Sequence, residues 1–108
     1  IDKVNKAAAV TGPAYVHILS PCPTGWRYAP DLSIRLGRLA VETGVFPLYE
    51  VEDGEYKLNF DFPQLRPVGD YLALQGRFRH LPEEVIDKIE ARVNAEYQKL
   101  KKKLEEDV

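Results

Sequence analysis

Residues 13–27 read PAYVHILSPCPTGWR. The run over 14–19 is apolar, contains β-branched side chains and is bounded by prolines, which predicts a buried strand. Apolar side chains fall on both faces of this strand, as expected in a parallel sheet that helices cover on each side. A helix is predicted before the strand, over 2–9, and another after it. The stretch therefore indicates an α/β fold.

The only cysteine of the chain, Cys22, lies between two prolines directly after this strand. Each proline fixes its own φ and pushes the preceding residue toward extended geometry, so the direction of the sulfur is nearly set. Rigid presentation of one soft ligand suits a metal or cluster site. The alternative is a small buried side chain, because free cysteine is among the most buried residue types.

Composition and charge limit the class of protein. The 108 residues make at most one small domain, and acidic residues outnumber basic ones by two. This balance favours neither nucleic acid nor an anionic membrane as a partner. A lone cysteine excludes an internal disulfide framework, and no stretch resembles a membrane span or a signal peptide. We therefore expect a cytoplasmic protein.

The rest of the chain contains clear helix and turn signals. A helix is predicted to open at Pro30 and end near Thr43, with Gly44 as a left-handed C-cap. A hairpin is predicted over 46–60, because Asp53-Gly54 favours a primed turn. A short helix is predicted over 68–76 and a long one over 82–106. The long helix has a narrow apolar stripe that must dock on something: Ile86, Ile89, Val93, Tyr97, Leu100 and Leu104.

Several polar residues leave two interpretations open. His17 is either a hydrogen-bonded structural residue or part of a cofactor-facing surface. Arg35 and Arg38 form either a solvated helix face or a docking face for another subunit. The segment 77–80 concentrates positive charge around one aromatic ring, and it either binds an anion or phosphate or hydrogen-bonds to carbonyls and fixes a turn.

Two stretches resemble one known family. They are Gly12 to Tyr28, which contains Cys-Pro-Thr-Gly-Trp-Arg, and Leu74 to Leu81, which contains Gln-Gly-Arg-Phe-Arg-His-Leu. Both resemble the beta subunit of pyruvate:ferredoxin oxidoreductases near its C-terminus, and shorter matches between them extend the resemblance over nearly the whole chain. The resemblance implies a C-terminal piece of a doubly wound domain that binds thiamine diphosphate. Residues 1–44 would be the end of that domain, and residues 45–108 a C-terminal extension.

The resemblance also implies cofactors and partners. In most members of the family the beta subunit carries a 4Fe-4S cluster, and Cys22 occupies the position of its fourth ligand; the other three cysteines and the Mg-thiamine diphosphate ligands lie upstream. The implied parent enzyme oxidises pyruvate to acetyl-CoA and CO2 with ferredoxin as acceptor, and contains alpha, gamma and delta types of subunit. Trp26 would either shield the cluster or cap the sheet. No catalytic or thiamine-binding residue is assigned in this chain, and the fragment alone is expected to be inactive.

Two other functions fit the same residues. The hairpin and the long helix suit a non-catalytic subunit-interaction module. A related 2-oxoacid:ferredoxin oxidoreductase is the other alternative, although the residues after Cys22 resemble the pyruvate branch of the family more than the 2-oxoglutarate branch. Three more cysteines and a thiamine motif upstream would distinguish the catalytic subunit from the module.

Overall fold

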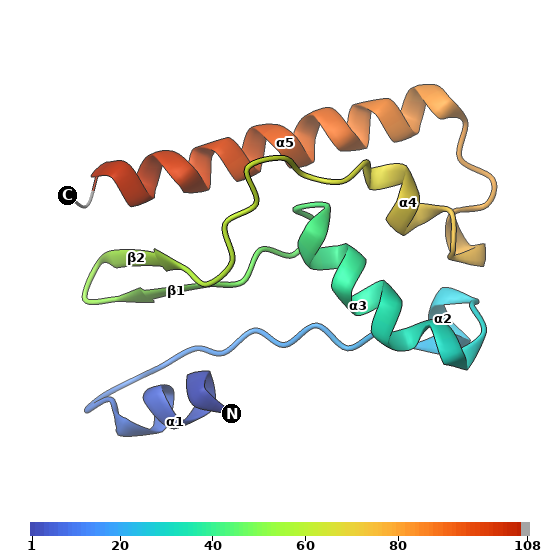
Figure 1. Cartoon of the computed structure of the whole chain (residues 1–108). Coiled ribbons are helices and arrows are strands. Elements are labelled where there is room, and N and C mark those ends of the chain that lie inside the picture. The colour runs from blue at the N-terminus through green and yellow to red at the C-terminus, as the bar shows by residue number, and fades with distance from the viewer. Residues whose placement is uncertain (107–108) are drawn as a thin grey trace.

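The computed structural model describes residues 1–106, which form helices around one two-stranded sheet. The helices are α1 (Asp2–Ala9), α2 (Pro23–Trp26), α3 (Ser33–Glu42), α4 (Val68–Leu72) and α5 (Glu83–Glu106), with 3-10 turns η1 (Pro30–Leu32) and η2 (Gly76–Phe78). The strands are β1 (Tyr49–Glu52) and β2 (Glu55–Leu58). The molecule is elongated, 45 × 28 × 20 Å, and α5 runs along it on the opposite side from α1 (Figure 1).

The hairpin forms around the predicted turn. Asp53 and Gly54 have φ of 52° and 82°, the left-handed pair that a primed turn requires. The strands pair antiparallel, with Tyr49 opposite Leu58 and Val51 opposite Tyr56. Strand β2 lies against α5. This packing stabilises the hairpin, because two strands alone are only marginally stable in water.

The core lies where α3 crosses α4 beneath α5. Its buried members are Leu36, Leu39, Ala40, Val68, Tyr71 and Leu72. The helix predicted over 30–43 begins as η1 and continues as α3, and its C-cap glycine, Gly44, has φ of 86° as expected. The short helix predicted over 68–76 is wrong in length: α4 ends at Leu72, because the buried side chain of Gln75 folds back and donates to the carbonyl of Tyr71 at 2.9 Å.

Helix α5 docks within the chain through its apolar stripe. Tyr97 and Leu100 are buried, while Ile86, Ile89 and Val93 pack against the core. Two polar contacts secure the same face: Glu90 accepts from the backbone amide of Val68 at 3.1 Å, and the hydroxyl of Tyr97 accepts from that of Phe62 at 3.3 Å. A carboxylate at the first amide of α4 also complements the dipole of that helix.

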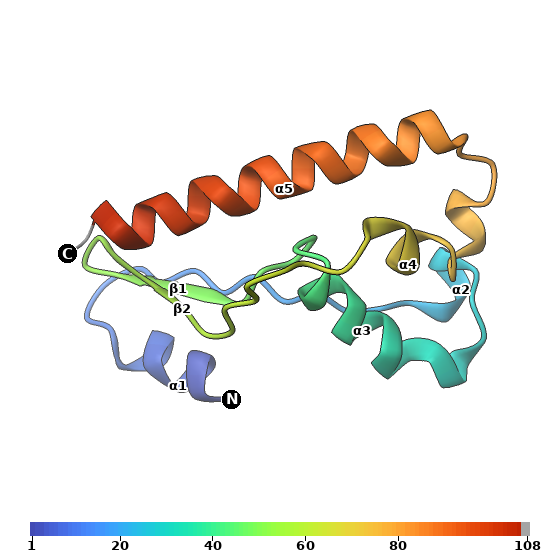
Figure 2. The same cartoon turned by 45° about the horizontal axis from the view of Figure 1, so that its top comes forward.

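The buried strand predicted over 14–19 is wrong in this structure. The segment is extended but belongs to no strand, and Tyr15 and Ile18 are 86% and 69% exposed. Figure 2 shows it running as an open trace between α1 and α2. The physical reason is that a parallel strand needs neighbours on its edges, and the described residues supply none beside it. Among residues 1–106, the sheet consists of the two strands of the hairpin.

Helix α1 attaches to the hairpin through charged side chains. The ammonium of Lys3 donates to the carbonyl of Tyr49 at 3.0 Å and to Oδ1 of Asn59 at 2.6 Å. The ammonium of Lys6 pairs with Glu50 at 3.2 Å. No residue of α1 is buried, so this helix is held by polar contacts and not by a shared apolar core.

Candidate functional site

The candidate site is the loop that presents Cys22. Pro23 opens the single helical turn α2, which suits proline because its missing amide has no partner there. Cys22 is the N-cap residue: its Sγ accepts from the amide of Gly25 at 3.3 Å, and its carbonyl accepts from the amide of Trp26 at 2.9 Å. The loop therefore holds the sulfur in one direction.

The Cys22 side chain is exposed and is a free thiol. The interpretation of this residue as a small buried side chain is therefore wrong for this structure. Within residues 1–106, no group of three or more His, Cys, Asp and Glu side chains is placed to hold a metal ion. The one cysteine thus offers a single soft ligand at the surface, without other protein ligands beside it in the described chain.

Trp26 packs beside the cysteine against aromatic and cationic neighbours. Its ring meets those of Tyr28 and Tyr71 edge to face, with centroids 6.2 and 6.3 Å apart. The guanidinium of Arg77 lies over the indole, 4.2 Å from its centroid, and 4.5 Å from that of Phe78. This packing ties α2 to the α4–η2 region of the core.

Arg77 has a structural role in this arrangement. Besides its two ring contacts, its Nε donates to the side-chain oxygen of Gln75 at 2.7 Å. The residue thus fixes the turn by a hydrogen bond to a carbonyl oxygen, as the structural interpretation of 77–80 predicts, although this carbonyl belongs to a side-chain amide. Arg79 and His80 take no part in this network and are exposed.

A basic pocket, defined by Arg27, Gly76, Arg79 and His80, lies between the Cys22 loop and η2; its volume is about 410 Å³. A backbone hydrogen bond of 2.8 Å from the amide of Gly76 to the carbonyl of Arg27 holds its two sides together. Arg27 has the left-handed φ of 59°, which is uncommon for a side-chain-bearing residue. The anion-binding interpretation of 77–80 covers Arg79 and His80, but the sequence gives no signal that Arg27 lies beside them, because Arg27 and Arg79 are far apart in the chain.

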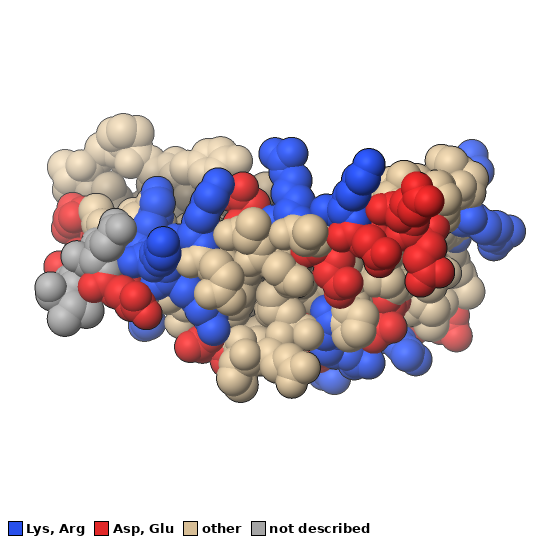
Figure 3. Space-filling model, turned by 90° about the horizontal axis from the view of Figure 1, so that it is seen from above, with Lys and Arg blue, Asp and Glu red and all other residues tan. Residues whose placement is uncertain are grey.

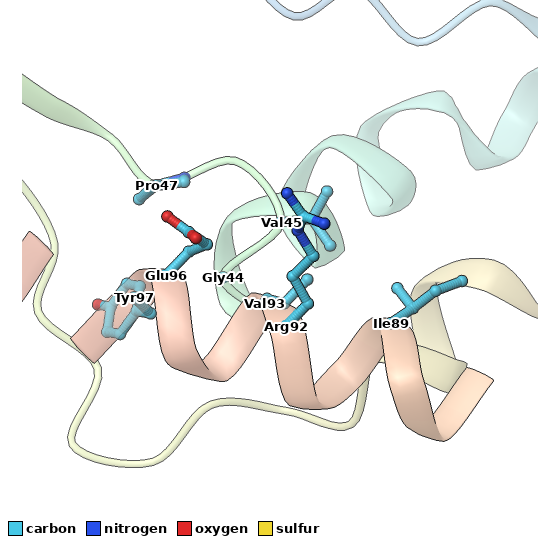
Figure 4. A pocket seen from close by; sticks show the side chains of 8 residues that line it. All are labelled: Gly44, Val45, Pro47, Ile89, Arg92, Val93, Glu96 and Tyr97. Carbon is cyan, nitrogen blue, oxygen red and sulfur yellow. The ribbon is translucent and has the colours of Figure 1, made fainter. Parts of the chain in front are cut away.

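A second hollow of about 290 Å³ lies between residues 44–47 and α5. Figure 4 shows the side chains that line it: Gly44, Val45, Pro47, Ile89, Arg92, Val93, Glu96 and Tyr97. Its lining is mostly apolar, and it contains no nucleophile. We assign it to imperfect packing of α5 on the α3 terminus.

The other residues singled out in the sequence lie apart from the cysteine loop. His17 is exposed, and its ring meets that of Phe46 edge to face at 5.0 Å. Arg35 and Arg38 are exposed on α3, and their role in docking stays a prediction. Figure 3 looks down on α5 and shows acidic groups gathered right of centre, with basic groups over the left half and the middle of the face and again at its right edge. This face thus carries both positive and negative charges. Among the described residues, no helix is long and apolar enough to cross a membrane.

No family model matches the chain. Among curated proteins, it is 49% identical over 88 residues to the pyruvate synthase subunit PorB of Methanocaldococcus jannaschii, covering 82% of this chain and 30% of that protein. It is 48% identical over 101 residues to the subunit of the same name from Methanothermobacter marburgensis, covering 94% and 35%. It is 43% identical over 104 residues to the ketoisovalerate oxidoreductase subunit VorB of Pyrococcus furiosus, covering 94% and 33%. The chain thus spans about a third of the length of the curated relatives it matches.

Proposed function

We propose that this chain, a homologue of about one third of the B subunits of pyruvate synthase and ketoisovalerate oxidoreductase, is the cluster-binding part of such a subunit in a 2-oxoacid:ferredoxin oxidoreductase. The observation that carries the proposal is the 48% sequence identity to the Methanothermobacter marburgensis subunit, in an alignment that covers 94% of this chain. The other subunits of the oxidoreductase would then be its partners. Pyruvate is the proposed substrate.

Cys22 is the proposed cluster ligand, and its surroundings fit that role. The thiol is exposed, so three thiolates from elsewhere in the subunit have access to the same iron–sulfur group. The amide of Gly25 already donates to Sγ, which is the kind of contact that tunes the potential of a bound cluster. When bound, a 4Fe-4S cluster supplies one-electron transfer. The chain contributes one fixed thiolate and a hydrogen bond to it.

Thiamine diphosphate and its Mg ion are proposed for the parent subunit, but not on residues of this chain. No residue of this chain is assigned to them: Asn59 accepts from Lys3, and Asp53 lies in the hairpin turn. The chain has one cysteine, whereas a 4Fe-4S cluster takes four thiolates. We therefore propose that residues 1–108 alone bind no stable cluster and transfer no electrons.

The segment 14–19 is proposed to be a strand of the doubly wound sheet of that subunit. It is extended, both of its faces are apolar, and Val16 is 39% exposed although valine is usually buried in sheets. Neighbouring strands from the rest of the subunit would cover it. Hydrogen exchange on the full-length subunit tests this: we expect slow exchange of the amides of 15–18, and fast exchange there would contradict it.

The ligand assignment is tested with Cys22→Ser in the full-length subunit, assembled with its partners. We expect lost or degraded iron at one cluster, an altered low-temperature EPR signal, and slower reduction of ferredoxin with substrate binding retained. Thr24→Ala, an exposed change in the same loop, is the control and is expected to leave the iron content unchanged. Full iron and an unchanged EPR spectrum in the serine variant would reject the assignment.

A branched-chain 2-oxoacid is the second candidate substrate, because one of the similar proteins is a ketoisovalerate oxidoreductase subunit. The substrate is identified by comparing kcat/KM for pyruvate and for 2-ketoisovalerate in the assembled enzyme. We expect a higher kcat/KM for pyruvate. A higher kcat/KM for 2-ketoisovalerate would instead identify a branched-chain 2-oxoacid as the substrate.

A further inference from the structure

The basic pocket has a built framework. The Gly76 amide donates to the Arg27 carbonyl, and a Cβ added at Gly76 would lie 2.7 Å from Cβ of Arg27. Only glycine allows this approach without a shift of the backbone. The two segments that carry Arg27 and Arg79 are thus joined backbone to backbone. The pocket is a fixed arrangement and not a chance meeting of long side chains.

The positive charge of this pocket has no internal partner. None of its lining residues is acidic. Within residues 1–106, the side chains of Arg27, Arg79 and His80 form no ion pair and no hydrogen bond with one another or with any other residue. Arg77, the nearest additional cation in sequence, is held by Trp26, Phe78 and Gln75. The structural role expected of 77–80 is therefore fulfilled by Arg77 and leaves the other two residues unused.

We propose that the basic pocket binds a phosphate group, either free or as the ester of a small molecule. Two guanidinium groups offer planar pairs of donors that match phosphate oxygens, and the imidazole of His80 adds a third donor. A doubly charged anion also relieves the repulsion between neighbouring cations. The volume of about 410 Å³ has room for the phosphate and part of the group esterified to it. The proposal stands on this geometry and does not depend on the proposed function.

The test is an NMR titration of the full-length subunit, ¹⁵N-labelled at glycine and arginine, at constant ionic strength. The probes are inorganic phosphate, adenosine 3′,5′-bisphosphate as a phosphate ester, and acetate as a carboxylate. We expect saturable shifts of the Gly76 amide and of the arginine side-chain signals with both phosphates. Tighter binding of the ester would identify a phosphorylated small molecule as the source, and equal or tighter binding of inorganic phosphate would identify the free ion.

Two variants from different segments keep the test decisive. Arg79→Ala and Arg27→Gln are each expected to weaken phosphate binding about tenfold, the loss expected for one charge-assisted hydrogen bond. Arg35→Ala removes an equally exposed arginine on α3 and is the matched control, with unchanged affinity expected. A dispersed spectrum establishes that each variant is folded. Unchanged affinity in both pocket variants, no saturable shift with phosphate, or acetate binding as tightly as phosphate would overturn the proposal.

Discussion

The amide of Gly76 donates a 2.8 Å hydrogen bond to the carbonyl of Arg27, across 49 positions of sequence, and the site for a Cβ on Gly76 is occupied. This one contact joins the Cys22 loop to the turn that follows α4. Trp26 and Arg77 pack immediately beside it. The position of the cysteine loop on the core therefore depends on a residue with no side chain as well as on the packing of Trp26.

Gly76→Ala is expected to destabilise the chain by about 2 kcal/mol. The new Cβ would meet Cβ of Arg27 at 2.7 Å and its carbonyl oxygen at 3.0 Å, so the backbone must move and the hydrogen bond lengthens. Urea unfolding measures the loss. Gly37→Ala is the control: its Cβ would lie 3.8 Å from Pro21 in ordinary contact, and alanine favours the interior of α3. Equal stability of the Gly76 variant and the native chain would contradict the argument.

Gly44 and Gly54 both have positive φ but differ in their surroundings. A Cβ on Gly44 would approach Leu65 to 2.9 Å and Val93 to 3.3 Å, whereas one on Gly54 would meet nothing within 4 Å. Gly54→Ala is expected to cost about 1 kcal/mol from backbone strain alone, and Gly44→Ala clearly more. Thermal melting of the two variants gives the order. Equal or reversed costs would contradict the argument and would show that Leu65 and Val93 move aside without cost.

Val93→Asp is expected to lower stability by about 2 kcal/mol. Val93 is partly buried on the face of α5 that packs against the core, so the change loses apolar contact and places a carboxylate beside apolar groups. Urea unfolding followed by the Trp26 fluorescence measures this loss. Asn94→Asp introduces the same charge at the next, exposed position and should be nearly silent. Similar effects of the two variants would mean that charge on α5, and not docking, determines the result.

The contact of α1 with the hairpin is expected to weaken in acid. Hydrogen bonding by Lys6, aided by the charges of Lys3 and Lys6, lowers the pKa of Glu50 below its usual value of 4.5. The ionised carboxylate therefore favours docking above that usual value, and this contribution is lost as the pH falls through the lowered pKa. Chemical shifts of α1 amides followed from pH 7 to 2 measure the change.

Glu50→Gln provides the matched control for this titration. It keeps the size of the side chain but cannot ionise, so the pH-dependent step in the α1 shifts should disappear in that range. The same step in the glutamine variant would assign it to another carboxyl group.

Local signals were sufficient to predict the elements whose geometry depends on a few neighbouring residues. Asp53 and Gly54 favour a primed turn by themselves, and the stripe of α5 indicates which face is buried. The segment 14–19 was predicted wrongly as buried, because burial of a strand depends on neighbouring strands that its own residues do not encode. The Cys22 loop is predicted from its prolines. The anion-binding interpretation of 77–80 covers Arg79 and His80 of the basic pocket, but Arg27 joins them through a long-range contact with Gly76 that has no local signal.

The extended segment before the cysteine loop is held at both ends. Helix α1, which precedes it, is fastened to the hairpin by Lys3 and Lys6, and α2, which follows it, contacts η2. Holding both ends restricts the conformations that the stretch of chain between them can adopt. Pairing with a neighbouring strand would then require little further ordering, so more of the free energy of the new backbone hydrogen bonds would remain as affinity. The chain thereby presents an extended segment for which the conformational entropy lost on pairing is reduced in advance.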